Sequence, residues 1–257
     1  MLKDNEVLEV KKLINDLYAF RHDNEHNARA CTLCDEALGL ADAILCDKST
    51  AKYALKITTH TGKMTGIRSL STYKLVCGTC LSLKDNPATI CHHCYVDKTL
   101  SMYRQMTPAL IYNTLLLKYT KLEKRQLPVI NDLSFRFESF SDLQNAQHLQ
   151  NLYAIARNNP QTRFALWTKN LKLIQTEKAP KNLNIIISSP ILNECLPLAE
   201  KIIERVKATT SCTHVKVFTV YDAEHIEQKQ NCLKRCLECG KCYSKNNKEQ
   251  FISELLK

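Results

Sequence analysis

Two cysteine arrays are the part of this sequence in which residue type and spacing most clearly indicate chemistry. The first array is two CxxC pairs separated by ten residues, and the second is four cysteines near the C-terminus. A CxxC loop directs both thiolates toward one metal centre, and four thiolates satisfy zinc or an iron–sulfur cluster. The sequence therefore predicts metal binding by Cys77, Cys80, Cys91 and Cys94, and by Cys232, Cys236, Cys239 and Cys242.

Spacing alone does not choose the metal. The mixed gaps of the second array favour a 4Fe–4S cluster, because a zinc ribbon usually carries a second CxxC pair after a long spacer. Zinc is the alternative, and spacing does not decide whether the arrays form two centres or share ligands in one. The remaining clustered cysteines are expected to be ordinary thiols on a helical layer; these are Cys31, Cys34 and Cys46.

The composition is that of a globular chain without a membrane segment. Its 257 residues are 44% hydrophobic, and no apolar run approaches the roughly 20 residues that span a bilayer. The polar N-terminus does not resemble a secretory signal, so we expect a cytoplasmic protein whose cysteines are reduced. The net charge of +10 makes nucleic acid a candidate partner, although the scattered lysines favour a solvated basic surface.

Helical periodicity predicts an N-terminal helical extension over residues 1–50, with helices at 4–18 (Asp4 as N-cap) and 29–45. Residues 51–257 are expected to form one α/β domain that contains both arrays. Within it, residues 53–59 read as a strand, and a helix starts at Thr107. A final helix is predicted over residues 248–256.

The middle of the chain alternates strands with helices. The strands are predicted at 133–140, 163–168, 184–188 and 215–221, and the helices at 141–158, 170–174 and 196–206. A capping box, Ser141-x-x-Gln144, is expected to open the first of these helices. Such alternation predicts a parallel sheet with helices, either a partial β/α barrel or an open sheet.

Polar side chains gather where these strands end, which is where parallel sheets bind ligands. Arg136 and Glu138 are expected on the same side of the first strand, because side chains alternate. This ring of polar residues is the candidate substrate or cofactor site, and it comprises Arg136, Glu138, Ser139, Asp142, Thr168, Lys169, Ser188, Ser189 and Asp222.

Several motifs in sequence order resemble the Gene product 88 family of phages and bacteria, whose function is uncharacterised. They include Met64-x-Gly-Ile-x-Ser-Leu-Ser-Thr72, both cysteine arrays, Phe164-Ala-Leu-Trp-Thr-Lys-Asn170 and Val217-Phe-Thr-Val-Tyr-Asp222. The resemblance covers about residues 53–257, and if the chain is phage-encoded it implies the host cytoplasm. Ser141 stands where relatives carry glycine, which would stiffen the turn after the first strand.

A looser likeness is to the barrel of radical S-adenosylmethionine enzymes. The spacing of Cys232, Cys236 and Cys239 matches their cluster motif, but those enzymes place it after their first strand. Cys242 would also complete the coordination and leave no open iron. S-adenosylmethionine is thus a third ligand to consider, at the level of fold analogy alone.

Two functions follow from these observations. The first is an iron–sulfur protein on an α/β scaffold, as a redox or radical enzyme of unknown substrate. The alternative is a zinc-stabilised module that binds nucleic acid or is purely structural. The sequence does not decide whether the chain is an enzyme, nor its oligomeric state.

Overall fold

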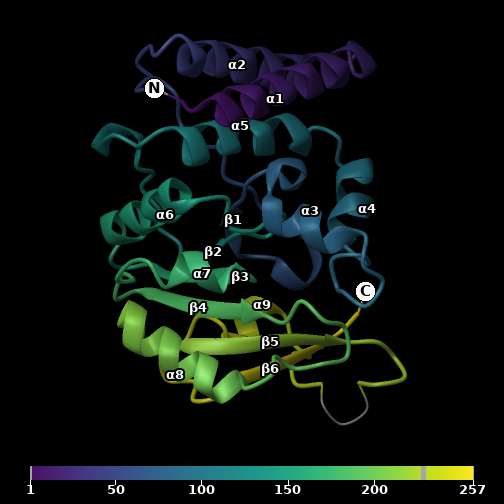
Figure 1. Ribbon diagram of the computed structural model, residues 1–257, viewed down its shortest axis with the longest axis vertical. Helices are drawn as coiled ribbons and strands as arrows, with labels where there is room; N and C mark the ends of the chain where they lie inside the picture. The colour runs from purple at the N-terminus through teal and green to yellow at the C-terminus, as the bar shows by residue number, and fades with distance from the viewer. Residues whose placement is uncertain (1, 227–229, 257) are drawn as a thin grey trace.

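A computed structural model describes residues 2–226 and 230–256. Within them lies a six-stranded sheet in which every strand is parallel to its neighbours and the spatial order follows the sequence, as Figure 1 shows. The predicted α/β class with a parallel sheet is therefore confirmed. The strands are β1 (Arg68–Leu70), β2 (Ser134–Phe137), β3 (Arg163–Thr168), β4 (Leu183–Ser188), β5 (Val215–Tyr221) and β6 (Phe251–Leu255).

Helices connect the strands and cover one face of the sheet. In Figure 1, α8 runs beside β4 and β5, while α1 and α2 form a separate layer above α5. The helices are α1 (Asp4–Asp23), α2 (Ala28–Leu45), α3 (Gly78–Lys84), α4 (Tyr95–Met102), α5 (Met106–Tyr119), α6 (Ala146–Asn158), α7 (Leu171–Ile174), α8 (Ala199–Thr210) and α9 (Cys236–Cys239). Three short 3-10 turns are η1 (Gly62–Met64), η2 (Lys74–Val76) and η3 (Lys124–Gln126).

The two faces of the sheet have different partners. Phe164 and Leu166 of β3 join the main hydrophobic core with the helices. Ala165 and Trp167 of the same strand face the other way, into a smaller cluster that contains Tyr243 of the C-terminal segment. We call this second side the inner face. Tyr243, Cys236 and Cys242 pack there, so the segment that carries the second cysteine array covers this face.

The N-terminal helices share the main core. Leu13, Leu17 and Leu40 are fully buried there together with residues of α5 and the sheet. Glu9 of α1 forms an ion pair with Lys118 Nζ of α5 at 2.7 Å and accepts the Tyr119 hydroxyl at 2.7 Å. Both predicted N-terminal helices are confirmed, although Lys3 rather than Asp4 is the N-cap of the first.

Two predicted elements near the chain ends are wrong. Residues 53–59 form no strand and contribute only an isolated bridge between Thr58 and Ser69, whereas β1 lies in the following segment. The predicted C-terminal helix is the strand β6, whose residues pair with β5. The apolar residues of that segment fit either period, so pairing with the exposed edge of β5 decided between them.

Two predicted helix starts also differ from the structure. Helix α6 begins at Ala146, where Asn145 is the N-cap and its side chain accepts the backbone N–H of His148. Residues 141–144 are instead part of the loop that follows β2. Helix α5 has Gln105 as its N-cap, so Thr107 lies inside the first turn.

Candidate functional site

Asp142 anchors the loop after β2 to the end of β3. Its Oδ1 accepts the Thr168 hydroxyl at 2.5 Å, and its Oδ2 accepts the Lys169 backbone N–H at 2.8 Å. The residue is almost fully buried. The structure thus brings together three of the predicted polar residues at the carboxyl ends of neighbouring strands.

The first cysteine array lies against this loop. Cys77 is the N-cap residue of α3, and its Sγ lies 3.8 Å from the Asp142 carbonyl oxygen. A hydrogen bond from Cys80 lowers the pKa of the Cys77 thiol, and the same bond raises the pKa of Cys80. Burial raises the pKa of Cys91, which also feels the charges of Lys169 and Cys94. The array is therefore gathered beside the end of β3.

Lys169 is the cation of this region. Burial disfavours its ammonium form, but the neighbouring Cys91 and Asp142 outweigh that effect, so the pKa of Lys169 is raised. A lysine that stays charged among thiols favours their thiolate form.

The second cysteine array crosses the inner face of the sheet. The Cys232 backbone N–H donates to Ser253 of β6 at 3.1 Å, and the Cys242 carbonyl accepts from Asn184 Nδ2 of β4 at 2.9 Å. Burial raises the pKa of the Cys242 thiol, and its charge interacts with those of Cys232, Cys236 and Cys239. The four cysteines of this array are thus neighbours inside the fold.

Arg136 is the cation that faces the second array. Its guanidinium stacks over the Trp167 ring at 4.0 Å, and it donates to Met64 Sδ at 3.5 Å. Its positive charge opposes the burial that raises the pKa values of Cys236 and Cys242. No carboxylate forms an ion pair with Arg136 among the residues that the structure describes.

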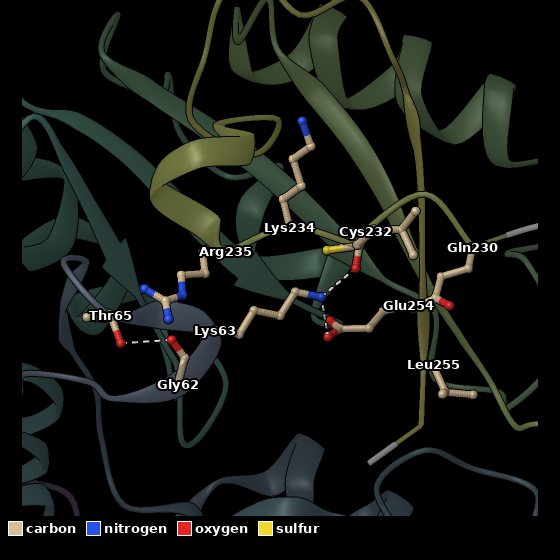
Figure 2. A pocket seen from close by; sticks show the side chains of 10 residues that line it. Gly62, Lys63, Thr65, Gln230, Cys232, Lys234, Arg235, Glu254 and Leu255 are labelled. Atoms are coloured by element: carbon tan, nitrogen blue, oxygen red, sulfur yellow. Dashed lines mark hydrogen bonds and ion pairs between the residues drawn. The ribbon is translucent and has the colours of Figure 1, made fainter.

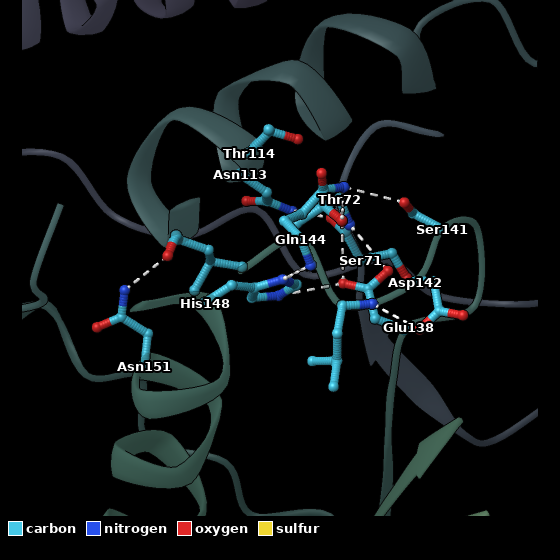
Figure 3. Close-up of polar contacts among 12 residues, drawn as sticks. Ser71, Thr72, Asn113, Thr114, Glu138, Ser141, Asp142, Gln144, His148 and Asn151 are labelled. Carbon is cyan, nitrogen blue, oxygen red and sulfur yellow. Dashed lines mark hydrogen bonds and ion pairs between the residues drawn. The ribbon is translucent and has the colours of Figure 1, made fainter. Parts of the chain in front are cut away.

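Glu138 does not face the same side as Arg136, and this prediction is wrong. Its φ of +56° reverses the alternation of side chains immediately after β2. The carboxylate accepts the Thr72 hydroxyl at 3.1 Å and lies 3.3 Å from His148 Nε2 of α6, as Figure 3 shows. Ser139 follows it and donates its backbone N–H to the Ser71 hydroxyl. Burial raises the pKa of Glu138. The network is therefore a group of hydrogen-bonded polar side chains enclosed within the hydrophobic core.

His148 belongs to this buried polar network, and the sequence analysis did not identify it. Its Nδ1 lies 3.2 Å from the backbone N–H of Gln144 and must accept that proton, which assigns the ring proton to Nε2 beside Glu138. The only signal in the sequence is its position three residues after Asn145, which places it in the first turn of α6.

The remaining predicted polar residues serve other local structure. Ser188 is buried at the end of β4, and the Ser189 hydroxyl donates to the Glu194 carbonyl at 2.8 Å. Asp222 accepts from Asn193 Nδ2 at 2.7 Å, and this bond, with one to His225, lowers its pKa to about 2. None of the contacts described for these residues reaches a cysteine array. The predicted ring is therefore not one site: Asp142, Thr168 and Lys169 lie beside the first array, whereas Ser188, Ser189 and Asp222 serve other local structure.

Residues 2–226 and 230–256 contain no group of three or more histidine, cysteine or acidic side chains already in a metal-binding geometry. The three cysteines of the N-terminal helices have local partners: Cys31 Sγ lies 3.5 Å from the Asn24 carbonyl, and Cys46 Sγ lies 3.5 Å from Asp42 Oδ1. Burial raises the pKa of Cys34 to about 11. Over the same described ranges, every helix is too short or too polar to cross a bilayer.

Comparison with known proteins gives one family. The family model for Gene product 88 matches residues 43–245, which spans β1 to β5 and both cysteine arrays. The match begins ten residues earlier than the motifs suggested and ends before β6. Neither the comparison with curated proteins nor that with solved structures gives a match. The matched residues make up more than half of the chain, so the chain belongs to the Gene product 88 family.

Proposed function

We propose that this protein binds two iron–sulfur clusters, one at each cysteine array. The observation that carries the proposal is the proximity of thiols within each array. Cys242 interacts with all three other members of its array, and Cys91 interacts with Cys94 and Cys77 of the other. Four thiolates are the usual donor set of a 4Fe–4S cluster.

The surroundings of the arrays support two centres rather than one shared centre. The charged neighbours of the first array are Lys169 and Asp142. Those of the second include Arg136, Lys63, Lys216 and Glu254. The cysteines that shift the pKa values of Cys91 and Cys242 belong in each case to the same array.

Each proposed centre has a cation beside it. A cluster held by four thiolates is anionic, and burying such a charge is costly unless a positive charge compensates it. Lys169 would compensate the first centre and Arg136 the second, where the guanidinium otherwise has no carboxylate partner among the described residues. Since the metal must draw the thiols into tetrahedral positions, binding would tighten loops that are already adjacent.

The four-cysteine donor sets favour electron transfer or a structural role over cleavage of S-adenosylmethionine. That reaction needs an iron without a thiolate ligand, and each array supplies four cysteines. We therefore expect no 5′-deoxyadenosine when the reduced protein is incubated with S-adenosylmethionine.

Metal analysis of protein purified without oxygen tests the proposal. We expect iron and acid-labile sulfide corresponding to two 4Fe–4S clusters for each chain, with a brown colour. Cys80→Ser and Cys239→Ser should each remove about half of the iron, because each removes a ligand from one centre. Cys31→Ser is the matched control, since Cys31 lies outside both arrays, and it should retain all of the iron.

Stoichiometric zinc in colourless protein would refute the iron–sulfur proposal and favour the zinc module. In that case, salt-dependent binding of DNA or RNA would be the next measurement, because phosphate contacts release counterions. Loss of all iron in either serine variant would instead show that the arrays share one centre.

A further inference from the structure

A hollow of about 560 Å³ lies beside the second cysteine array. Figure 2 shows it between the η1 loop, the segment that begins at Cys232, and the end of β6. Its volume is within the range of about 300–1,000 Å³ that is usual for sites that bind small molecules. None of the site residues predicted from the strand ends lines it.

The hollow lies where the loop before edge strand β1 meets edge strand β6. The Lys63 ammonium, in η1, donates to Glu254 Oε1 of β6 at 2.7 Å and to the Cys232 carbonyl at 2.5 Å. This ion pair ties the loop before the first edge strand to the last edge strand, and both side chains are mostly buried. The wall is therefore held in place by bonds that do not involve a ligand.

The rest of the lining is positively charged. Among the lining residues that the structure describes, three basic side chains, Lys63, Lys234 and Arg235, stand against the carboxylate of Glu254, which gives these residues a net formal charge of +2. Neither Lys234 nor Arg235 has an ion-pair partner among residues 2–226 and 230–256. Figure 2 shows the Arg235 guanidinium reaching toward the η1 loop, while Lys234 extends away from Lys63.

One side of the hollow is apolar. Leu233 lines it and is 72% exposed, so its side chain is available to a ligand. Leu255 at the end of β6 also lines it. A ligand that covers Leu233 would remove apolar surface from water while its charged end meets the basic side chains.

We propose that this hollow binds a phosphorylated small molecule. A phosphate monoester carries a charge of about −1.5 to −2 at neutral pH, which matches the net charge of the lining. The planar guanidinium of Arg235 fits two phosphate oxygens at once, and Leu233 contacts the organic part. None of the proposed phosphate contacts is a cysteine thiol, although Cys232 also lines the hollow.

Calorimetric titration of the full-length protein with phenyl phosphate tests this assignment. We expect saturable binding of one molecule, weakened at least about 10-fold in Arg235→Gln, because a hydrogen bond to a charged group contributes about 1.5–3 kcal/mol. Arg235→Lys should bind with intermediate affinity. Leu233→Ser should weaken phenyl phosphate but leave inorganic phosphate unchanged, since only the ester carries an apolar group.

Lys201→Gln is the matched control, because Lys201 is an exposed lysine on α8, which covers the opposite face of the sheet. It removes the same charge and should leave the affinity unchanged. Absence of saturable binding by the wild-type protein would overturn the proposal, as would equal weakening in Lys201→Gln. Binding of a single-stranded oligonucleotide that depends on Arg235, without binding of phenyl phosphate, would assign the cations to nucleic acid instead.

Discussion

Replacement of Glu138 by alanine is the most informative test of the buried polar network. The carboxylate accepts two enclosed donors, the Thr72 hydroxyl at 3.1 Å and the Thr72 backbone N–H at 3.4 Å, and it lies 3.3 Å from His148 Nε2. Glu138 is 1% exposed and His148 is 0% exposed, so water does not replace the lost acceptor. Alanine would leave both Thr72 donors without this acceptor and His148 without its acidic neighbour.

The expected cost follows from these contacts. Each orphaned buried donor costs about 1–3 kcal/mol, and we take the lower limit because burial of the carboxylate itself is unfavourable. Glu138→Ala should therefore lower the free energy of unfolding by about 2 kcal/mol, from the two Thr72 donors that lose their acceptor. Glu138→Gln keeps one oxygen acceptor and loses the buried charge, so it should cost less than about 1 kcal/mol.

Glycine at the same position separates the network from backbone strain. Glu138 has a φ of +56°, a conformation that costs a residue with a side chain about 1–2 kcal/mol and glycine almost nothing. Glu138→Gly should thus be more stable than Glu138→Ala by about 1 kcal/mol, the reverse of the usual order. The assay is urea unfolding at pH 7, monitored by the far-ultraviolet circular dichroism of protein with a known metal content.

Two results would refute this reasoning. A Glu138→Ala variant whose free energy of unfolding is within about 1 kcal/mol of the wild-type value would show that the Thr72 donors find other partners. Glu138→Gly less stable than Glu138→Ala would show that the left-handed backbone is not a source of strain. The first result would also leave His148 without a role in holding the loop that carries Asp142.

Three further predictions concern other parts of the fold. Gly66→Ala should cost about 1–2 kcal/mol in urea unfolding and reduce iron at the second array, because Gly66 has a φ of +85° and a Cβ would lie 3.0 Å from Leu237 of α9. Leu17→Ala should cost about 2–5 kcal/mol in the same assay, since Leu17 is fully buried in the core shared with the sheet. Burial, followed by the charge of Arg136, lowers the pKa of His60 from 6.5 to about 4. The unfolded chain therefore takes up a proton first, so stability should fall as the pH drops from 6.5 to 4, and His60→Gln should flatten that part of the profile.

The elements that sequence predicted best have local signals. Strand β3 was predicted with its observed bounds, and α7 follows it because the Asn170 side chain caps the helix by accepting the Leu173 backbone N–H. Strand β4 is a run of isoleucines that is buried on both faces. Apolar periodicity likewise predicted α1 and α2. In each case the pattern that identifies the element lies within the element itself.

The sequence by itself determined the parallel α/β class, the presence of two cysteine arrays and the polar character of the strand ends. Only the tertiary structure decided how these parts meet. It turned Glu138 toward His148, because a left-handed residue reverses the alternation of side chains. It made residues 251–255 a strand, because the edge of β5 was available for pairing. It also placed the second array on the inner face beside Arg136, because contacts between distant segments depend on distance in space, which spacing along the chain does not specify.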